Sequence, residues 1–209
     1  HPPTQADGDV DASIPKDFGD KATADRIIMG SGEQSVKGDK ISLVCLDRAK
    51  KWLASFPDKN NDYTSVVRAF QQFFGTIKPK HIYSDNAKEI EKACAEMLYS
   101  ADTSTPHRPQ SLGVAERAVR KVKEGTRTIL AQSGLRALWW NWAMPCFCFL
   151  YNVIERVVEV VDDKVGKRLS TPYEARFGTP FLKQDLFQFG CEVEYLPANP
   201  DYTAPQHTF

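Results

Sequence analysis

The fold is decided by the stretch KISLVCL at residues 40–46, which leads through a charged turn at 47–51 into WLASF at 52–56. Both runs are rich in strand-forming residues, so we predict a β-hairpin that ends at Pro57. One strand is predicted ahead of it at residues 24–29, where Gly30 to Gly32 interrupt the pattern. Another is predicted after Pro79, at residues 81–84.

Helical spacing of apolar residues begins after these strands. A helix is predicted from Asp62, a plausible N-cap, to Gly75. Two more are predicted at residues 87–99 and 110–132, separated by a Thr/Ser/Pro-rich loop at 103–109. Strands paired as a meander and then alternating with helices indicate an α/β domain with a mixed sheet and helices packed on it.

Residues 135–153 are apolar enough to raise the question of a membrane span. The run contains polar residues and a central Pro145, and acidic residues follow it, so a buried core helix kinked at Pro145 is the better prediction. Cys146 and Cys148 lie two positions apart and would point to different sides of that helix, which favours inert thiols over a shared metal. None of the five cysteines forms a CxxC pair, which argues against a zinc ribbon or a disulfide scaffold.

The composition of the 209-residue chain, with 27 Lys and Arg against 27 Asp and Glu, is typical of an intracellular globular domain. No signal peptide is visible, and the missing initiator Met suggests a piece of a longer polypeptide. The zero net charge conceals an uneven distribution. Residues 1–20 carry five Asp against one Lys, a net charge of −4, so the net charge of the remaining residues is +4. We predict a flexible acidic lead-in at 1–20.

Three acids stand out by position. Asp25 lies in the first predicted strand, Asp85 ends the strand at 81–84, and Glu116 begins the helix at 110–132. Strand ends and helix starts present side chains to a shared crevice, where three carboxylates would need divalent cations such as Mg²⁺. Each also has an ordinary explanation, because Asp85 could cap the next helix and helical Glu residues are usually solvated.

A basic ridge begins at Glu116. At 100° per residue, Glu116 shares about 60° of one helical face with three basic residues, Arg120, Lys123 and Arg127. Between Gln110 and Gln132, five basic residues oppose two acids. Such a ridge is either a solvated face with i,i+4 pairs such as Glu116–Arg120, or a surface that holds nucleic acid phosphates.

Two segments carry a family resemblance, IYSDN at residues 82–86 and TPHRPQSLGVAER at 105–117. Together with LVCLD at 43–47, they resemble the retroviral-type integrase catalytic core. TPYE at 171–174 and FGCEVEY at 189–195 are similar to segments that follow the core in Ty1/copia-type retrotransposon polyproteins. The resemblance implies a ribonuclease-H-like mixed five-stranded sheet flanked by helices. It divides the chain into the lead-in, a catalytic core at 21–178, and a C-terminal extension at 179–209 with helical and short β structure.

The resemblance also implies the site. Asp25, Asp85 and Glu116 would be the catalytic and metal-binding triad, holding two Mg²⁺ or Mn²⁺ ions, while Asp47 matches a hairpin acid that is not a ligand. The residues expected to contact DNA are Arg108, Gln110, Arg117, Arg120, Lys123 and Arg127. Leu112 departs from the family, which usually has Asn or Gln there, and no His-His-Cys-Cys zinc module precedes the core in this piece.

The resemblance leads us to expect an integrase core that joins 3′ ends of element DNA to target DNA. It is expected to act in the nucleus as a homo-oligomer with DNA and no membrane as its partner. One alternative is a degenerate or domesticated domain that binds DNA without catalysis. A weaker one is a ribonuclease-H-like nuclease that only hydrolyses.

Overall fold

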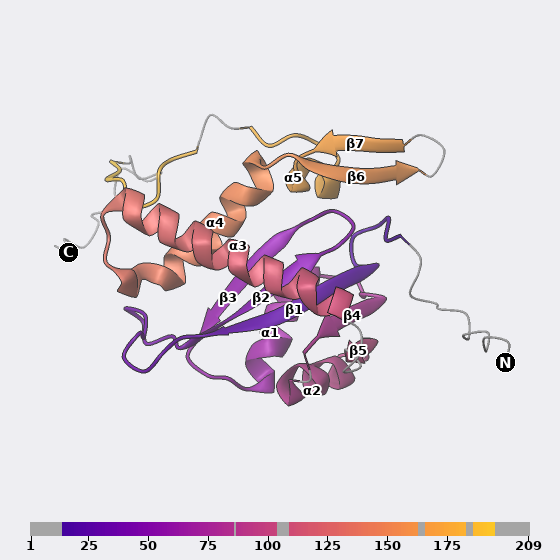
Figure 1. The fold of residues 1–209 in the computed structure, drawn as a ribbon, viewed down its shortest axis with the longest axis horizontal. Helices are drawn as coiled ribbons and strands as arrows, with labels where there is room; N and C mark the ends of the chain where they lie inside the picture. Colours follow the sequence, from indigo (N-terminus) through magenta and orange to yellow (C-terminus); the bar gives the residue numbers. More distant parts are fainter. Residues whose placement is uncertain (1–13, 86, 104–108, 163–165, 183–185, 195–209) are drawn as a thin grey trace, which may run out of the picture.

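The computed structural model describes residues 14–85, 87–103, 109–162, 166–182 and 186–194. The main sheet has four strands of four to eight residues, β1 (Lys21–Ile28), β2 (Ile41–Asp47), β3 (Leu53–Asp58) and β4 (His81–Ser84). A three-residue strand, β5 (Ala101–Thr103), lies at the edge beside β4, giving the order β3-β2-β1-β4-β5 (Figure 1). The first three strands pair antiparallel, whereas β1, β4 and β5 pair parallel, so the predicted mixed sheet is confirmed.

Helices cover both faces of this sheet. On one face, α1 (Tyr63–Phe74) and α2 (Lys88–Glu96) bury a cluster that includes Phe70 and Phe73. On the other face, α3 (Pro109–Ser133) and α4 (Trp140–Ile154) bury a second cluster, and α3 crosses in front of the strands in Figure 1. The predicted cap of α1 is confirmed, since the Asp62 carboxylate accepts a hydrogen bond from the Ser65 N–H at 2.8 Å.

Several boundaries differ from the prediction. The hairpin strand does not end at Pro57 but runs to Asp58, because β3 is an edge strand in which a missing N–H is tolerated. The second helix stops at Glu96 instead of residue 99, since Leu98 adopts a left-handed backbone conformation with φ of 54°. The sequence prediction also missed β5.

The edge of β3 is covered on its open side by a single amide. Asn152 of α4 accepts a hydrogen bond from the Leu53 N–H at 2.9 Å and donates one to the Leu53 carbonyl at 2.7 Å. One position before the strand ends, Pro57 has no N–H to offer. The edge strand therefore presents few of the backbone groups that would recruit another strand.

The apolar run that includes α4 is a core helix, as predicted. Its side chains Trp140, Ala143, Met144 and Cys148 are buried, and Pro145 lies inside the helix. Burial raises the pKa of the Cys148 thiol to about 12, which agrees with an inert cysteine. Across the described ranges, no helix combines the length and the apolar character that a membrane crossing requires.

Packed structure begins a few residues ahead of β1. Phe18 lies against Phe73 and Phe74, and the Gly19 N–H donates to the Asp47 carboxylate at 2.8 Å. Asp20 forms an ion pair with Lys80 at 2.6 Å. The last part of the predicted lead-in is thus attached to the sheet, and residues 1–13 lie outside the described part of the chain.

After α4 the chain forms a hairpin of β6 (Val157–Asp162) and β7 (Gly166–Ser170), followed by α5 (Pro172–Phe177). The helical and short β elements expected of the extension therefore lie before residue 179. Residues 179–182 and 186–194 contain neither a helix nor a strand. Phe189 packs against the cluster under α3 and α4, so this segment lies on the core.

Candidate active site

Asp25 and Asp85 lie where β1 and β4 stop pairing. The parallel ladder runs from Lys21 beside His81 to Ala24 beside Ser84, so each acid is the next residue on its own strand. Neighbouring strands lie about 4.8 Å apart, and paired residues of a parallel ladder point to the same face. The two carboxylates therefore extend from adjacent backbone positions.

The face to which they point follows from the alternation along β1. Ala24 belongs to the cluster under α1 and α2, whereas Ile27 belongs to the cluster under α3 and α4. Asp25 alternates with Ala24 and shares the side of Ile27, which is the side that α3 covers. Glu116 is carried by α3, and its side chain is exposed.

The pKa of Asp25 shows that these acids are electrostatic neighbours. Burial raises this pKa, and the negative charges of Asp85 and Glu116 raise it further. The Arg26 backbone N–H, 2.7 Å from Asp25 Oδ1, and the Arg26 charge act in the opposite direction. A partly buried carboxylate beside two others is a site that a divalent cation would stabilise.

Asp85 provides an independent observation. Its Oδ1 is buried and accepts no hydrogen bond from any residue that the structure describes. The alternative role as a helix cap is not seen, because Ala87 occupies the N-cap position of α2 and no side chain caps that helix. A buried carboxylate oxygen that lacks a donor, next to Asp25, fits the oxygen ligands that Mg²⁺ prefers.

The three acids do not form a closed ligand set. Among the described residues, no group of three or more His, Cys, Asp or Glu side chains is arranged so that it could hold a metal ion. Asp25 and Asp85 are adjacent in the sheet, whereas the Glu116 side chain reaches solvent from the covering helix. The site is thus a pair of carboxylates with a third nearby.

Asp47, the other acid considered for this site, has a structural role. Its side chain is fully buried and accepts hydrogen bonds from the backbone N–H groups of Gly19 and Lys50 at 2.8 and 2.7 Å. Burial raises its pKa to about 6, although these hydrogen bonds and the Arg176 charge act to lower it. Asp47 lies beside Ala22 in the ladder, on the face opposite Asp25.

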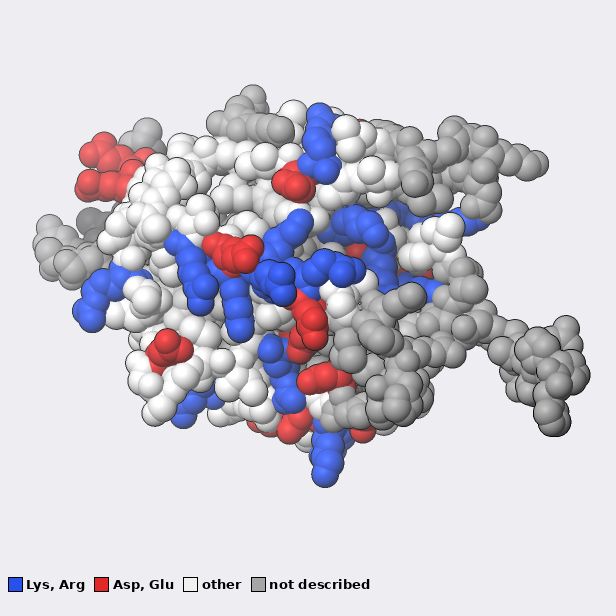
Figure 2. Space-filling view, in the orientation of Figure 1, with Lys and Arg blue, Asp and Glu red and all other residues white. Residues whose placement is uncertain are grey.

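Basic side chains line the exposed side of α3. Figure 2 shows Lys and Arg gathered across the middle of this face, with a few acids between them. The exposed basic residues are Arg117, Arg120, Lys121, Lys123 and Arg127. In the described part of the chain no ion pair joins Arg120 to Glu116 or Glu124, so the i,i+4 pairing considered above is not formed. Arg108 and the side chains of Gln110 and Leu112 lie outside what the structure describes.

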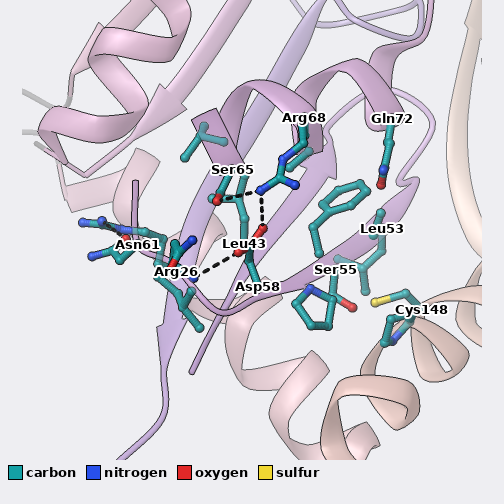
Figure 3. A pocket seen from close by; sticks show the side chains of 18 of the residues that line it. Arg26, Leu43, Leu53, Ser55, Asp58, Asn61, Ser65, Arg68, Gln72 and Cys148 are labelled. Carbon is teal, nitrogen blue, oxygen red and sulfur yellow. Dashed lines mark hydrogen bonds and ion pairs between the residues drawn. The ribbon is translucent and has the colours of Figure 1, made fainter. Parts of the chain in front are cut away.

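No sequence pattern indicated the network around Arg26. Its Nη1 donates to Glu89 Oε2 at 2.9 Å and to Asn61 Oδ1 at 2.7 Å. These contacts lie at one end of a pocket of about 540 Å³ between β3, α1 and α4. Figure 3 shows Arg26 and Asn61 at that end and Cys148 at the other, with Arg68 held by Asp58.

Known proteins with similar sequences are polyproteins. No family model matches the chain. The retrovirus-related Pol polyprotein from transposon TNT 1-94 of Nicotiana tabacum is 29% identical over 130 residues, covering 57% of this chain and 10% of the polyprotein. That from transposon RE2 of Arabidopsis thaliana is 28% identical over 129 residues, with 60% and 8% covered. The Pro-Pol polyprotein of feline foamy virus is 26% identical over 161 residues, with 73% and 13% covered. The chain thus spans about a tenth of the length of these relatives.

Solved structures with the same fold are integrases. The catalytic core domain of BIV integrase superposes with a TM-score of 0.52 at 20% identity, covering 77% of this chain and 95% of that core. A simian T-cell lymphotropic virus intasome, solved with the PP2A regulatory subunit B56 gamma, gives a TM-score of 0.59 at 15% identity, with 92% and 63% covered. The chain is therefore similar in sequence to retrovirus-related polyproteins and has the fold of the retroviral integrase catalytic core.

Proposed function

We propose that this domain catalyses the joining of element DNA to target DNA by metal-dependent phosphoryl transfer. The observation that supports it most is the adjacency of Asp25 and Asp85 at the end of the β1–β4 ladder, under the helix that carries Glu116. The raised pKa of Asp25 and the buried Oδ1 of Asp85 are the features expected of carboxylates that receive a divalent cation.

In the proposed reaction, a 3′-hydroxyl of element DNA attacks a target phosphodiester. A new P–O bond forms to the element end, the bond to the target 3′-oxygen breaks, and that oxygen leaves with a proton. Asp25 and Asp85 would bind Mg²⁺ or Mn²⁺, and Glu116 would complete the set by rotating its exposed side chain toward the pair. Two such ions would supply nucleophile activation and leaving-group stabilisation.

The α3 face is the proposed DNA contact. Its basic side chains start beside Glu116 and continue for about three turns, so phosphates held along the helix would lead into the carboxylate pair. Two of the proposed contacts, Arg120 and Lys123, are one and two turns beyond Glu116. The intasome with a similar fold supports the further proposal that this chain works as a multimer on DNA. Action in the nucleus is proposed only because DNA is the proposed substrate.

A strand-transfer assay with Mg²⁺ or Mn²⁺ tests the chemistry. Glu116→Gln is expected to abolish joining, whereas Glu124→Gln, a neutralisation on the same helix, is expected to keep it. Asp25→Asn and Asp85→Asn are expected to behave like Glu116→Gln. Equal joining by wild type and Glu116→Gln would refute the triad, and products that are cut but never joined would favour a hydrolytic nuclease.

A second candidate is DNA binding without catalysis, favoured by the open arrangement of the three acids. Four phosphate contacts along α3 would give a slope of about −3.6 for log K against log salt. Removing Lys123 would reduce that slope by about one, with or without catalysis. Binding of this kind with no metal-stimulated joining would establish the binding function, and turnover would eliminate it.

A further inference from the structure

The sheet brings the backbones of Asp25 and Asp85 side by side, but the two acids are not themselves paired in the β1–β4 ladder. Backbone pairing of β1 with β4 ends at Ala24 and Ser84, one residue before each acid. Beyond that point β4 gives way to the turn into α2. A contact that spans the gap after the ladder would therefore contribute to how far apart the two carboxylates lie.

Arg26 provides that connection on the opposite face of the sheet. It follows Asp25 directly, and its guanidinium reaches Glu89 in the first turn of α2 at 2.9 Å. The same Nη1 reaches Asn61, which precedes α1, at 2.7 Å. The Arg26 side chain is 15% exposed and that of Glu89 34%, so the ion pair is largely shielded from solvent. Arg26 thus ties the Asp25 position to the helix that follows Asp85.

We propose that Arg26 is a positioning residue, which sets the separation of the Asp25 and Asp85 carboxylates through its contacts with Glu89 and Asn61. The proposal rests on the proposed function, because it assumes that the two acids receive a divalent cation. Arg26 points away from the α3 face and so would touch neither the ion nor DNA bound along α3. Arg26 would instead act on the relative positions of the two carboxylates, as outer-shell residues do when they orient metal ligands.

The experiment measures Mn²⁺ binding to the purified full chain by isothermal titration calorimetry and by water-proton relaxation. Arg26→Gln is expected to raise the Mn²⁺ dissociation constant by about 10-fold or more, the usual cost of losing an outer-shell partner. Glu89→Gln should produce a smaller rise in the same direction. Arg26→Lys keeps the positive charge and a donor nitrogen on a shorter side chain, so it should restore part of the affinity.

Arg68→Gln is the control, since it removes an ion pair of similar length at the same pocket, Arg68 to Asp58 at 3.0 Å, although the Arg68 side chain is 62% exposed against 15% for Arg26. Thermal melting without metal measures the structural cost of each variant. We expect Arg68→Gln to leave the Mn²⁺ dissociation constant unchanged even where its melting temperature falls. An equal loss of Mn²⁺ affinity in Arg68→Gln would overturn the proposal.

Other outcomes separate this proposal from the one on which it rests. If wild type binds Mn²⁺, Asp85→Asn abolishes binding, and Arg26→Gln and Glu89→Gln bind normally, the positioning role is refuted while the metal site stands. If wild type shows no Asp85-dependent Mn²⁺ binding, the proposed function fails and the positioning role fails with it. Should Arg26→Gln not fold, Glu89→Gln decides, because its more exposed side chain can lose its charge with less disturbance.

Discussion

Gly125 lies within α3 at the point where Phe147 of α4 packs against that helix. A Cβ atom built at Gly125 would lie 2.0 Å from Phe147 Cε2 and 2.2 Å from its Cδ2. Favourable carbon contacts are about 3.5–4.0 Å long, so the two helices or the ring would have to move by about 1.5 Å. Gly125→Ala therefore tests how closely α3 must approach α4.

Two opposing effects decide the magnitude. Replacing an interior helical glycine by alanine favours the helix by about 1 kcal/mol. Overpacking a filled interface costs about 1–3 kcal/mol, and the short distances to an aromatic ring place this position at the upper end. We expect Gly125→Ala to lower the free energy of unfolding by about 2 kcal/mol, the difference between about 3 and about 1.

Gly113 is the control in the same helix. Among the described side chains, a Cβ there would meet the flexible end of Arg117 at 3.3 Å, so Gly113→Ala is expected to stabilise the chain by about 0.5–1 kcal/mol. In a Phe147→Ala background the obstruction at Gly125 is gone, and Gly125→Ala should then stabilise by up to about 1 kcal/mol. Urea unfolding followed by tryptophan fluorescence measures all four variants. The reasoning is refuted if Gly125→Ala is harmless, or if it costs the same with and without Phe147.

Three further predictions concern stability. Asp62→Ala removes the N-cap of α1 and should lower the free energy of unfolding by about 1 kcal/mol in urea titrations, whereas Asp62→Asn should stay near wild type. Asn152→Leu leaves the Leu53 N–H and carbonyl buried without partners and should cost about 2–3 kcal/mol; an unchanged urea midpoint would contradict it. Because burial raises the pKa of Asp47 from 3.8 to about 6, ionising this group disfavours the folded state increasingly as the pH rises from about 4 to 6. The stability of wild type minus that of Asp47→Asn should therefore fall by about 3 kcal/mol across that window, and a constant difference would exclude the effect.

Periodicity and capping residues were sufficient to predict most of the fold. The hairpin of β2 and β3, the helix capped by Asp62 and the buried apolar helix at 140–154 each follow from local signals that tertiary contacts reinforce. The ends of the elements were harder to predict. An edge strand tolerates Pro57, and Leu98 in a left-handed conformation can end a helix without a glycine. The three residues of β5 are too few to carry a periodic pattern.

The candidate site, too, could be predicted only in part from the sequence. Asp85 and Glu116 stand in a distinctive sequence context, and the structure brings Asp85 next to Asp25, as the resemblance implied. Arg26 could not have been found in this way, since its partners Glu89 and Asn61 are 63 and 35 positions away and no local pattern connects them. Likewise, the exposure of Glu116 depends on how α3 lies across the sheet, which no sequence period specifies.

The parallel pairing of β1 with β4 also has a consequence for when the site can exist. Asp25 and Asp85 are 60 positions apart in the chain, and Glu116 lies 91 positions after Asp25. Contacts between such distant positions form slowly, because the entropy of closing the intervening loop is lost before the contact is gained. During synthesis, the carboxylates cannot meet until the hairpin, α1 and β4 have all been made. The nascent chain would therefore carry its acids apart, so that a completed sheet is a precondition for bringing Asp25 next to Asp85.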